Sequence, residues 1–134
     1  MKKLKALFHD LQNADLCDAE QLAAWIDSGK IQSQKKGSET DSVFFKIIYD
    51  ANIRVMQFDR DLGILLLWMH LWLAENDPER DVDFDFEGEI LEDGSTNLLI
   101  SVNFEELPEF VKDANGLWES GLMDHDIADA LNEN

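Results

Sequence analysis

Cysteine, proline and positive charge are all scarce in this chain. Its 134 residues include one cysteine, two prolines and eleven Lys or Arg. Cys17 has no second cysteine with which to form an intramolecular disulfide, which indicates a reducing cytoplasm. No apolar run approaches the roughly 20 residues of a membrane-spanning helix. The longest run, "LGILLLWMHLWLA", contains His70 and predicts a buried helix, so no membrane partner is expected.

Sequence motifs for metal, phosphate or nucleophilic chemistry are missing as well. The three histidines, His9, His70 and His125, do not have the spacing of a zinc site, and there is no glycine-rich phosphate loop. An EF-hand loop counted from Asp81 has acids at its first three ligand positions, but Phe86 stands where the loop needs glycine. We therefore expect no enzymatic activity, no catalytic residues, no cofactor and no metal.

Negative charge is concentrated in the second half of the chain. Residues 1–67 hold nine Lys or Arg and ten Asp or Glu, whereas residues 68–134 hold two and nineteen. The net charge of the whole chain is −18. Such a half repels nucleic acid and anionic membranes and associates fastest with basic surfaces. Sequence-specific binding of nucleic acid is therefore not expected.

The densest acidic pattern is "DVDFDFEGE", residues 81–89. Acids at alternate positions line one face of a β-strand, and Val82, Phe84 and Phe86 line the other. A charged strand face is usually only solvated and discourages edge-to-edge aggregation, but the excess here favours an electrostatic interaction surface. The candidate interaction residues are Asp81, Asp83, Asp85, Glu87 and Glu89, together with Lys30, Lys35 and Lys36 of the polar segment 30–42.

Residues 1–29 are expected to form a helical hairpin. An apolar stripe with helical spacing runs from Leu4 to Leu11. Asp18 with Gln21 three residues later predicts the start of a second helix, whose apolar face would hold Leu22, Trp25 and Ile26. Gly29 stands where the helix C-terminus needs a residue that tolerates positive φ.

The remaining segments predict a sheet around one further helix. Residues 30–42 are expected to form a mobile loop, and residues 43–121 the sheet, with a helix over 62–75 that is buried on most sides. Within the sheet, residues 43–58 form one long bent strand or a hairpin, with a turn or bulge at "DAN". Two strands, 81–91 and 97–105, form an acidic hairpin. Residues 122–134 form an acidic tail.

Together these segments predict one domain over residues 1–134. Its fold class is α+β, a mainly antiparallel sheet with helices packed on one face. Trp25, Trp68 and Trp72 are expected in the core, and Trp118 in the core or at an interface.

Four stretches, in this order and spacing, carry a family resemblance: "LAAWIDSGKI", "FFKIIYDANIRVMQFDRD", "WLAENDP" and "FDFEGEILEDGSTNLLISVNFEE". They lie within residues 16–106. On these residues the chain resembles the tail completion protein R family of contractile-tailed temperate phages and prophages, one kind of tail terminator. None of the stretches is a catalytic signature.

The resemblance implies an assembly role and a terminator-like α+β fold without a cofactor. Such a protein caps the finished tail tube as a hexameric ring and provides the surface to which the head is joined. The implied partners are the tail tube and sheath proteins, a head-completion protein and further copies of the chain. The implied location is the cytoplasm of the bacterial host during assembly, and then the end of the virion tail.

The acidic residues have two uses in a terminator. They could face a lumen through which DNA slides, or they could dock on a basic patch of a tail or head protein. A different class of protein remains open: an acidic inhibitor or immunity protein that mimics DNA and blocks a basic nuclease. A terminator self-associates on a tube end, whereas an inhibitor forms a one-to-one complex with a basic enzyme. Acidity that serves only solubility is the third alternative.

Overall fold

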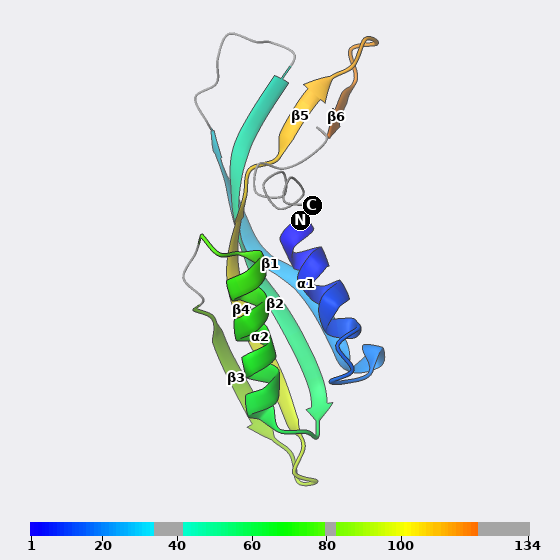
Figure 1. Ribbon diagram of the computed structural model, residues 1–134, viewed down its shortest axis with the longest axis vertical. Helices are drawn as coiled ribbons and strands as arrows, with labels where there is room; N and C mark the ends of the chain where they lie inside the picture. The colour runs from blue at the N-terminus through cyan, green and yellow to red at the C-terminus, as the bar shows by residue number, and fades with distance from the viewer. Residues whose placement is uncertain (34–41, 80–82, 121–134) are drawn as a thin grey trace. The chain divides into compact units, whose positions relative to one another are not determined.

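The structure, a computed structural model, describes residues 1–33, 42–79 and 83–120. Its elements are, in chain order, α1 (Lys2–Gln12), the 3-10 turn η1 (Ala19–Gln21), β1 (Leu22–Ser33), β2 (Ser42–Phe58), α2 (Leu62–Asn76), β3 (Asp85–Ile90), β4 (Thr96–Glu106), β5 (Glu109–Lys112) and β6 (Trp118–Ser120) (Figure 1). The strand order is β3-β4-β2-β5-β6, with β1 paired to β2. The predicted α+β class with a mainly antiparallel sheet is confirmed.

The chain divides into two compact units. The first unit consists of Met1–Asp27 and Asp50–Asn103, and the second of Ser28–Tyr49 and Phe104–Asn134. Both helices belong to the first unit, and β5 and β6 belong to the second. The single domain over residues 1–134 stays a prediction.

In the first unit, α1 and α2 lie on one face of the strands (Figure 1). The alternation of β2 and β4 explains why, because every second side chain of each strand is apolar and buried under the helices. The indole Nε1 of Trp72 in α2 donates a 2.7 Å hydrogen bond to Oδ2 of Asp10 in α1, which joins the two helices. The buried side chains of this core include Leu4, Leu7 and Leu11, Leu65, Met69, Trp72 and Leu73, Ala51, Ile53 and Val55, and Leu98, Ile100 and Val102.

Helix α2 has the predicted bounds within one residue, but the prediction that it is buried on most sides is wrong. Its N-terminus is capped by Asp61, whose Oδ1 accepts a 2.9 Å hydrogen bond from the backbone N–H of Gly63. The core covers only one face of the helix. On the opposite face Ile64, Leu67 and Leu71, hereafter the α2 stripe, are 49%, 50% and 56% exposed. This uncovered apolar face distinguishes α2 from an ordinary amphipathic surface helix.

The predicted second helix of residues 1–29 is wrong. Asp18 and Gln21 do interact, since the Asp18 backbone N–H donates to Oε1 of Gln21 at 2.7 Å, but they close only the three-residue turn η1. The chain then continues as β1, in which Trp25 and Ile26 are exposed. Pairing of β1 with β2 therefore overrides the helical spacing of the apolar residues.

Gly29 has a different role from the predicted helix C-terminus. It does not adopt positive φ, and a Cβ at this position would lie 3.1 Å from Cβ of Tyr49 and 3.2 Å from the carbonyl oxygen of Ile48. Both neighbours belong to β2, so glycine permits the close approach of β1 to β2 within the second unit.

The predicted loop 30–42 is correspondingly too long. Residues 30–33 belong to β1 and Ser42 begins β2, while residues 34–41 lie outside the described residues. Strand β2 also runs through "DAN" without a break, which confirms the single long strand predicted as one of two alternatives. The predicted acidic tail, 122–134, lies outside the described residues as well.

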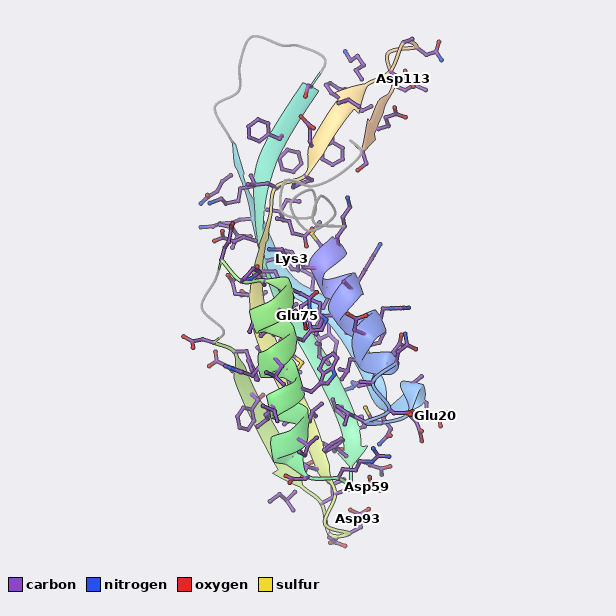
Figure 2. The ribbon with its side chains drawn as sticks, viewed as in Figure 1. Lys3, Glu20, Asp59, Glu75, Asp93 and Asp113 are labelled. Atoms are coloured by element: carbon purple, nitrogen blue, oxygen red, sulfur yellow. The ribbon has the colours of Figure 1, made fainter. Side chains whose placement is uncertain are left out.

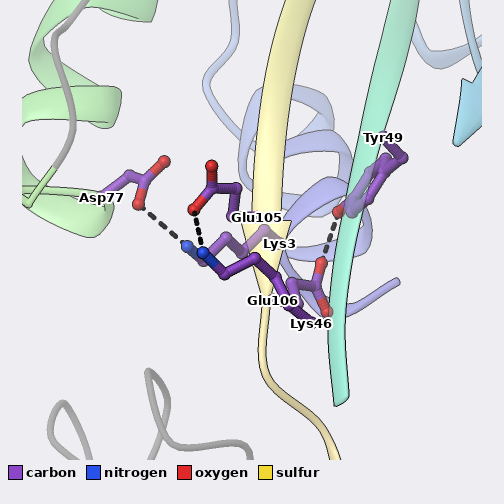
Figure 3. A network of polar contacts seen from close by, with 6 residues as sticks. All are labelled: Lys3, Lys46, Tyr49, Asp77, Glu105 and Glu106. Atoms are coloured by element: carbon purple, nitrogen blue, oxygen red, sulfur yellow. Dashed lines mark hydrogen bonds and ion pairs between the residues drawn. The ribbon is translucent and has the colours of Figure 1, made fainter. Parts of the chain in front are cut away.

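The second unit contains buried polar and stacked aromatic contacts. The Tyr49 hydroxyl, on β2, donates a hydrogen bond to the buried carboxylate of Glu106 on β4 (Figure 3). The rings of Phe45 and Phe110 stack with centroids 5.5 Å apart, where β5 pairs with β2. The hydrogen bond from Tyr49 explains how the carboxylate of Glu106 can be buried at the end of β4, because it replaces a hydrogen bond that water would otherwise donate.

The predicted hairpin between β3 and β4 is confirmed. Gly94 adopts φ +88°, as its turn requires. Oδ1 of Asp93 accepts hydrogen bonds from the hydroxyl of Ser95 at 2.6 Å and from its backbone N–H at 2.9 Å. These two bonds, the hydroxyl first, lower the pKa of Asp93. A lowered folded-state pKa stabilises the turn above the pKa of the unfolded chain, and this stabilisation is lost as the pH falls through the folded-state value.

We expect Ser95→Ala to raise the pKa of Asp93 toward its ordinary value, because the substitution removes the largest cause of the shift. The measurement is an NMR titration of the Asp93 carboxyl carbon between neutral and acid pH. Ser101→Ala, within β4 and away from the turn, is the control and should leave the titration unchanged. An unchanged pKa in Ser95→Ala contradicts the assignment of this hydrogen bond.

Candidate functional site

Strand β3 forms the edge of the sheet. In the part of the chain that the structure describes it pairs with β4 alone, in antiparallel register from Asp85 opposite Ser101 to Ile90 opposite Thr96. All six of its residues are exposed. The strand therefore has one paired side and one open side, and the open side is available to another chain.

The acids of β3 share one face of the strand, as the sequence predicts. Asp85, Glu87 and Glu89, hereafter the β3 acids, lie opposite Ser101, Leu99 and Asn97. Asp83, just before the strand, is exposed, and Asp81 lies outside the described residues. The other face of β3 is also open to solvent, since Phe86 is 50% and Ile90 is 79% exposed. An acidic and an apolar face are thus both accessible on the same edge strand.

The acidic face continues across the neighbouring strands of the first unit. Asp85 lines a hollow of about 320 Å³ together with Asp27 of β1 and Asp50 of β2. Within the hollow the Asn103 side-chain amide donates to Oδ1 of Asp50 at 2.9 Å. Three strands that are separate in the sequence therefore contribute carboxylates to one surface on the side of the sheet away from the helices.

A single arginine lines the adjacent hollow of about 460 Å³. The guanidinium carbon of Arg54 lies 5.8 Å from the ring centroid of Trp25, and Glu87 and Glu89 line the same hollow. The expectation that Trp25 is a core residue is therefore wrong: its ring is exposed beneath a cation that also faces carboxylates. Trp72 is buried as predicted, and Trp118 is exposed with Nζ of Lys112 5.1 Å from its ring centroid.

Of the three predicted basic contact residues, the structure describes only Lys30. Lys30 is exposed on β1 in the second unit, whereas Lys35 and Lys36 lie outside the described residues. Their role as contact residues stays a prediction.

Sequence reasoning did not identify the α2 stripe or the acids that join the β3 acids from other strands. A helix that is apolar all round is consistent with burial on every side and with burial on one side plus a contact face on the other. The sequence signal for the stripe was present but did not separate these two cases. Asp27 and Asp50 gave no signal, because their position beside Asp85 depends on the strand order.

The described residues show little that could support catalysis. Burial, and next the negative charge of Asp18, raise the pKa of the Cys17 thiol, which therefore stays protonated at neutral pH. Over the same residues, no group of three or more His, Cys, Asp or Glu side chains is placed to hold a metal ion. No helix in the described ranges is long and apolar enough to cross a membrane.

Comparison with known proteins gives a match to one protein family. No curated protein and no solved structure matches the chain. The family comparison matches residues 1–126 to P2 phage tail completion protein R (GpR). This match extends beyond residues 16–106, on which the resemblance in the sequence rests, and it includes both helices and all six strands. The chain therefore belongs to the P2 phage tail completion protein R (GpR) family.

Proposed function

We propose that this phage tail completion protein acts as a terminator: it caps the finished tail tube as a hexameric ring and provides the head-joining surface. The family supports a structural protein of the phage tail and of virion assembly. The observation on the molecule that carries the proposal is the α2 stripe. Three large apolar side chains on one helix face, each about half exposed, mark a contact surface.

A second copy of the chain is the proposed occupant of the α2 stripe. Two copies with a net charge of −18 each repel one another wherever acidic surfaces meet. Residues 62–74 of α2 contain no Asp, Glu, Lys or Arg. Contact through this helix therefore buries apolar area at the lowest electrostatic cost, which is what self-association of an acidic chain needs.

The acidic face of β3 has a separate proposed role. It docks on a basic surface of a tail tube, sheath or head-completion protein. Phe86 and Ile90 are exposed on the other face of the same edge strand, which favours a protein partner that covers the edge of β3 over a lumen through which DNA passes. A protein partner can bury these apolar side chains, whereas a hydrated duplex leaves them in water. The proposed ring has no enzymatic activity and assembles in the host cytoplasm before it becomes part of the virion tail.

Deletion of the gene from an inducible prophage is expected to yield filled heads beside detached tails of abnormal length. Electron microscopy of the induced lysate measures both. Supplying the wild-type protein should restore joined particles with tails of normal length. Normal, infectious particles in the deletion strain contradict the proposed function.

The rescue also tests the acidic face. Glu87→Lys with Glu89→Lys should fail to restore joined particles, because it reverses two of the β3 acids. The matched control is Glu20→Lys with Asp59→Lys, which changes the net charge by the same amount at exposed positions outside β3 (Figure 2). Equal rescue by both double variants removes the proposed role of the β3 acids.

A further inference from the structure

The backbone of β3 presents free hydrogen-bonding groups at a regular spacing. The Leu91 N–H donates to the Ser95 carbonyl at 2.8 Å and closes the hairpin. Because hydrogen-bonded pairs recur at every second residue of an antiparallel ladder, the β3 acids direct their N–H and C=O groups toward β4. Phe86, Gly88 and Ile90 direct theirs away from β4, to the open edge. Within the described residues, three donors and three acceptors in a row are thus available to one more strand.

The side chains along this edge leave room for another strand to approach. Gly88, in the middle of β3, has no side chain, and the three atoms nearest to a Cβ there would all belong to β4, on the paired side, with Cγ2 of Thr96 the nearest at 3.2 Å. Phe86 and Ile90 flank it on the same face and are exposed. A strand paired with β3 would therefore contact the backbone at Gly88 and cover the apolar side chains of Phe86, before it, and Ile90, after it.

The β3 acids decide which strand can bind. A second copy of β3 would place carboxylates opposite or diagonal to carboxylates on one face of the sheet, which is destabilising. A strand with Lys or Arg at alternate positions would place opposite charges in the same places. Apolar residues between its cations would then lie on the face of Phe86 and Ile90. The β3 acids therefore disfavour pairing of β3 with a second copy of β3 and favour pairing with a strand that alternates cationic and apolar residues.

We propose that β3 receives an added antiparallel strand from another tail or head protein, with Lys or Arg at every second position and apolar residues between them. The proposal deepens the docking role given above, on which it rests for the source of the strand. Affinity comes from backbone hydrogen bonds at Phe86, Gly88 and Ile90, and the choice of partner comes from the β3 acids.

A peptide tests the mode of binding without any phage. The probe is an end-blocked Lys-Val-Lys-Val-Lys-Val peptide, measured by fluorescence anisotropy against the full-length chain at about 0.15 M ionic strength. We expect it to bind about tenfold tighter than a peptide of the same composition with its lysines in one block, because only the alternating peptide can match both faces. Equal affinity for the two peptides means simple charge attraction and overturns the proposal.

N-methylation of the peptide gives the sharper test. In antiparallel addition the valines lie opposite Phe86, Gly88 and Ile90, so the valine N–H groups donate to β3 and the lysine N–H groups point away. Methylating the valine nitrogens should abolish binding, and methylating the lysine nitrogens should preserve it. Equal effects of the two methylations, or the opposite order, overturn the proposal.

Variants of β3 complete the test on the protein side. Ile90→Pro removes one outward N–H, whereas Ile90→Ala keeps that N–H and removes more apolar area than proline does, so greater loss of affinity in the proline variant identifies the backbone hydrogen bond as the cause. Circular dichroism shows whether each variant keeps its fold. If neither variant loses peptide binding, strand addition is overturned. If the peptide does not bind but deletion of the gene still prevents tail completion, this inference is overturned and the proposed function stands.

Discussion

Replacing Lys3 by Met is expected to lower the free energy of unfolding of the first unit by about 3 kcal/mol. Nζ of Lys3, on α1, lies 2.9 Å from Oδ1 of Asp77, and both side chains are about nine-tenths buried (Figure 3). Asp77 is the C-cap residue of α2, so the ammonium also lies near the negative end of that helix. Removing the lysine leaves a buried carboxylate without this cation, and that desolvated charge is the source of the cost.

Urea unfolding followed by tryptophan fluorescence measures the change in the free energy of unfolding of the first unit. Three of the four tryptophans, Trp25, Trp68 and Trp72, lie in the first unit. Lys5→Met is the matched control, because Lys5 is exposed on the same helix; its expected change is below about 0.5 kcal/mol. The double variant with Lys3→Met and Asp77→Leu should be more stable than the single Lys3→Met variant, since it removes both charges. A Lys3→Met variant as stable as Lys5→Met contradicts a structural role for the pair.

The parts of the fold that the sequence predicted correctly depend on local patterns. Phe45, Ile47, Tyr49, Ile53 and Val55 of β2 share odd numbers, which is consistent with one strand across "DAN", although the sequence left a hairpin open as the alternative. The turn around Gly94 and the helix from Leu62 were predicted for similar reasons, because a turn glycine, a capping aspartate and a run of helix formers act over a few residues.

The wrong predictions depend on contacts between distant segments. Leu22, Trp25 and Ile26 have helical spacing, but pairing with β2 makes their segment a strand. The β3 acids could be predicted because alternation places them on one face. Their meeting with Asp50 of β2 could not, since it requires the order of strands in the sheet. Similarly, the composition of α2 does not reveal which of its faces packs on the sheet.

The largest functional effect is expected from a charge placed in the α2 stripe. Leu71→Asp should weaken self-association on the tail about a hundredfold or more, because it removes a large apolar contact and buries a carboxylate at the subunit interface. Leu67→Asp, one turn earlier on the same face, should act in the same way. Because both side chains are about half exposed in the isolated chain, the fold itself should be nearly unaffected.

The measurement is the amount of the protein that copurifies with tails from a deletion strain supplied with each variant, together with the yield of joined particles. Leu117→Asp is the matched control: it makes the same substitution at a leucine that is 65% exposed between β5 and β6, outside α2. It should copurify with tails as the wild type does. If Leu71→Asp also copurifies normally, the ring does not form through α2, and the exposed apolar face of this helix needs another occupant. If only the stripe variants are lost from tails, the uncharged face of α2 is a surface that holds this acidic chain on the tail, as the proposed contact between its copies requires.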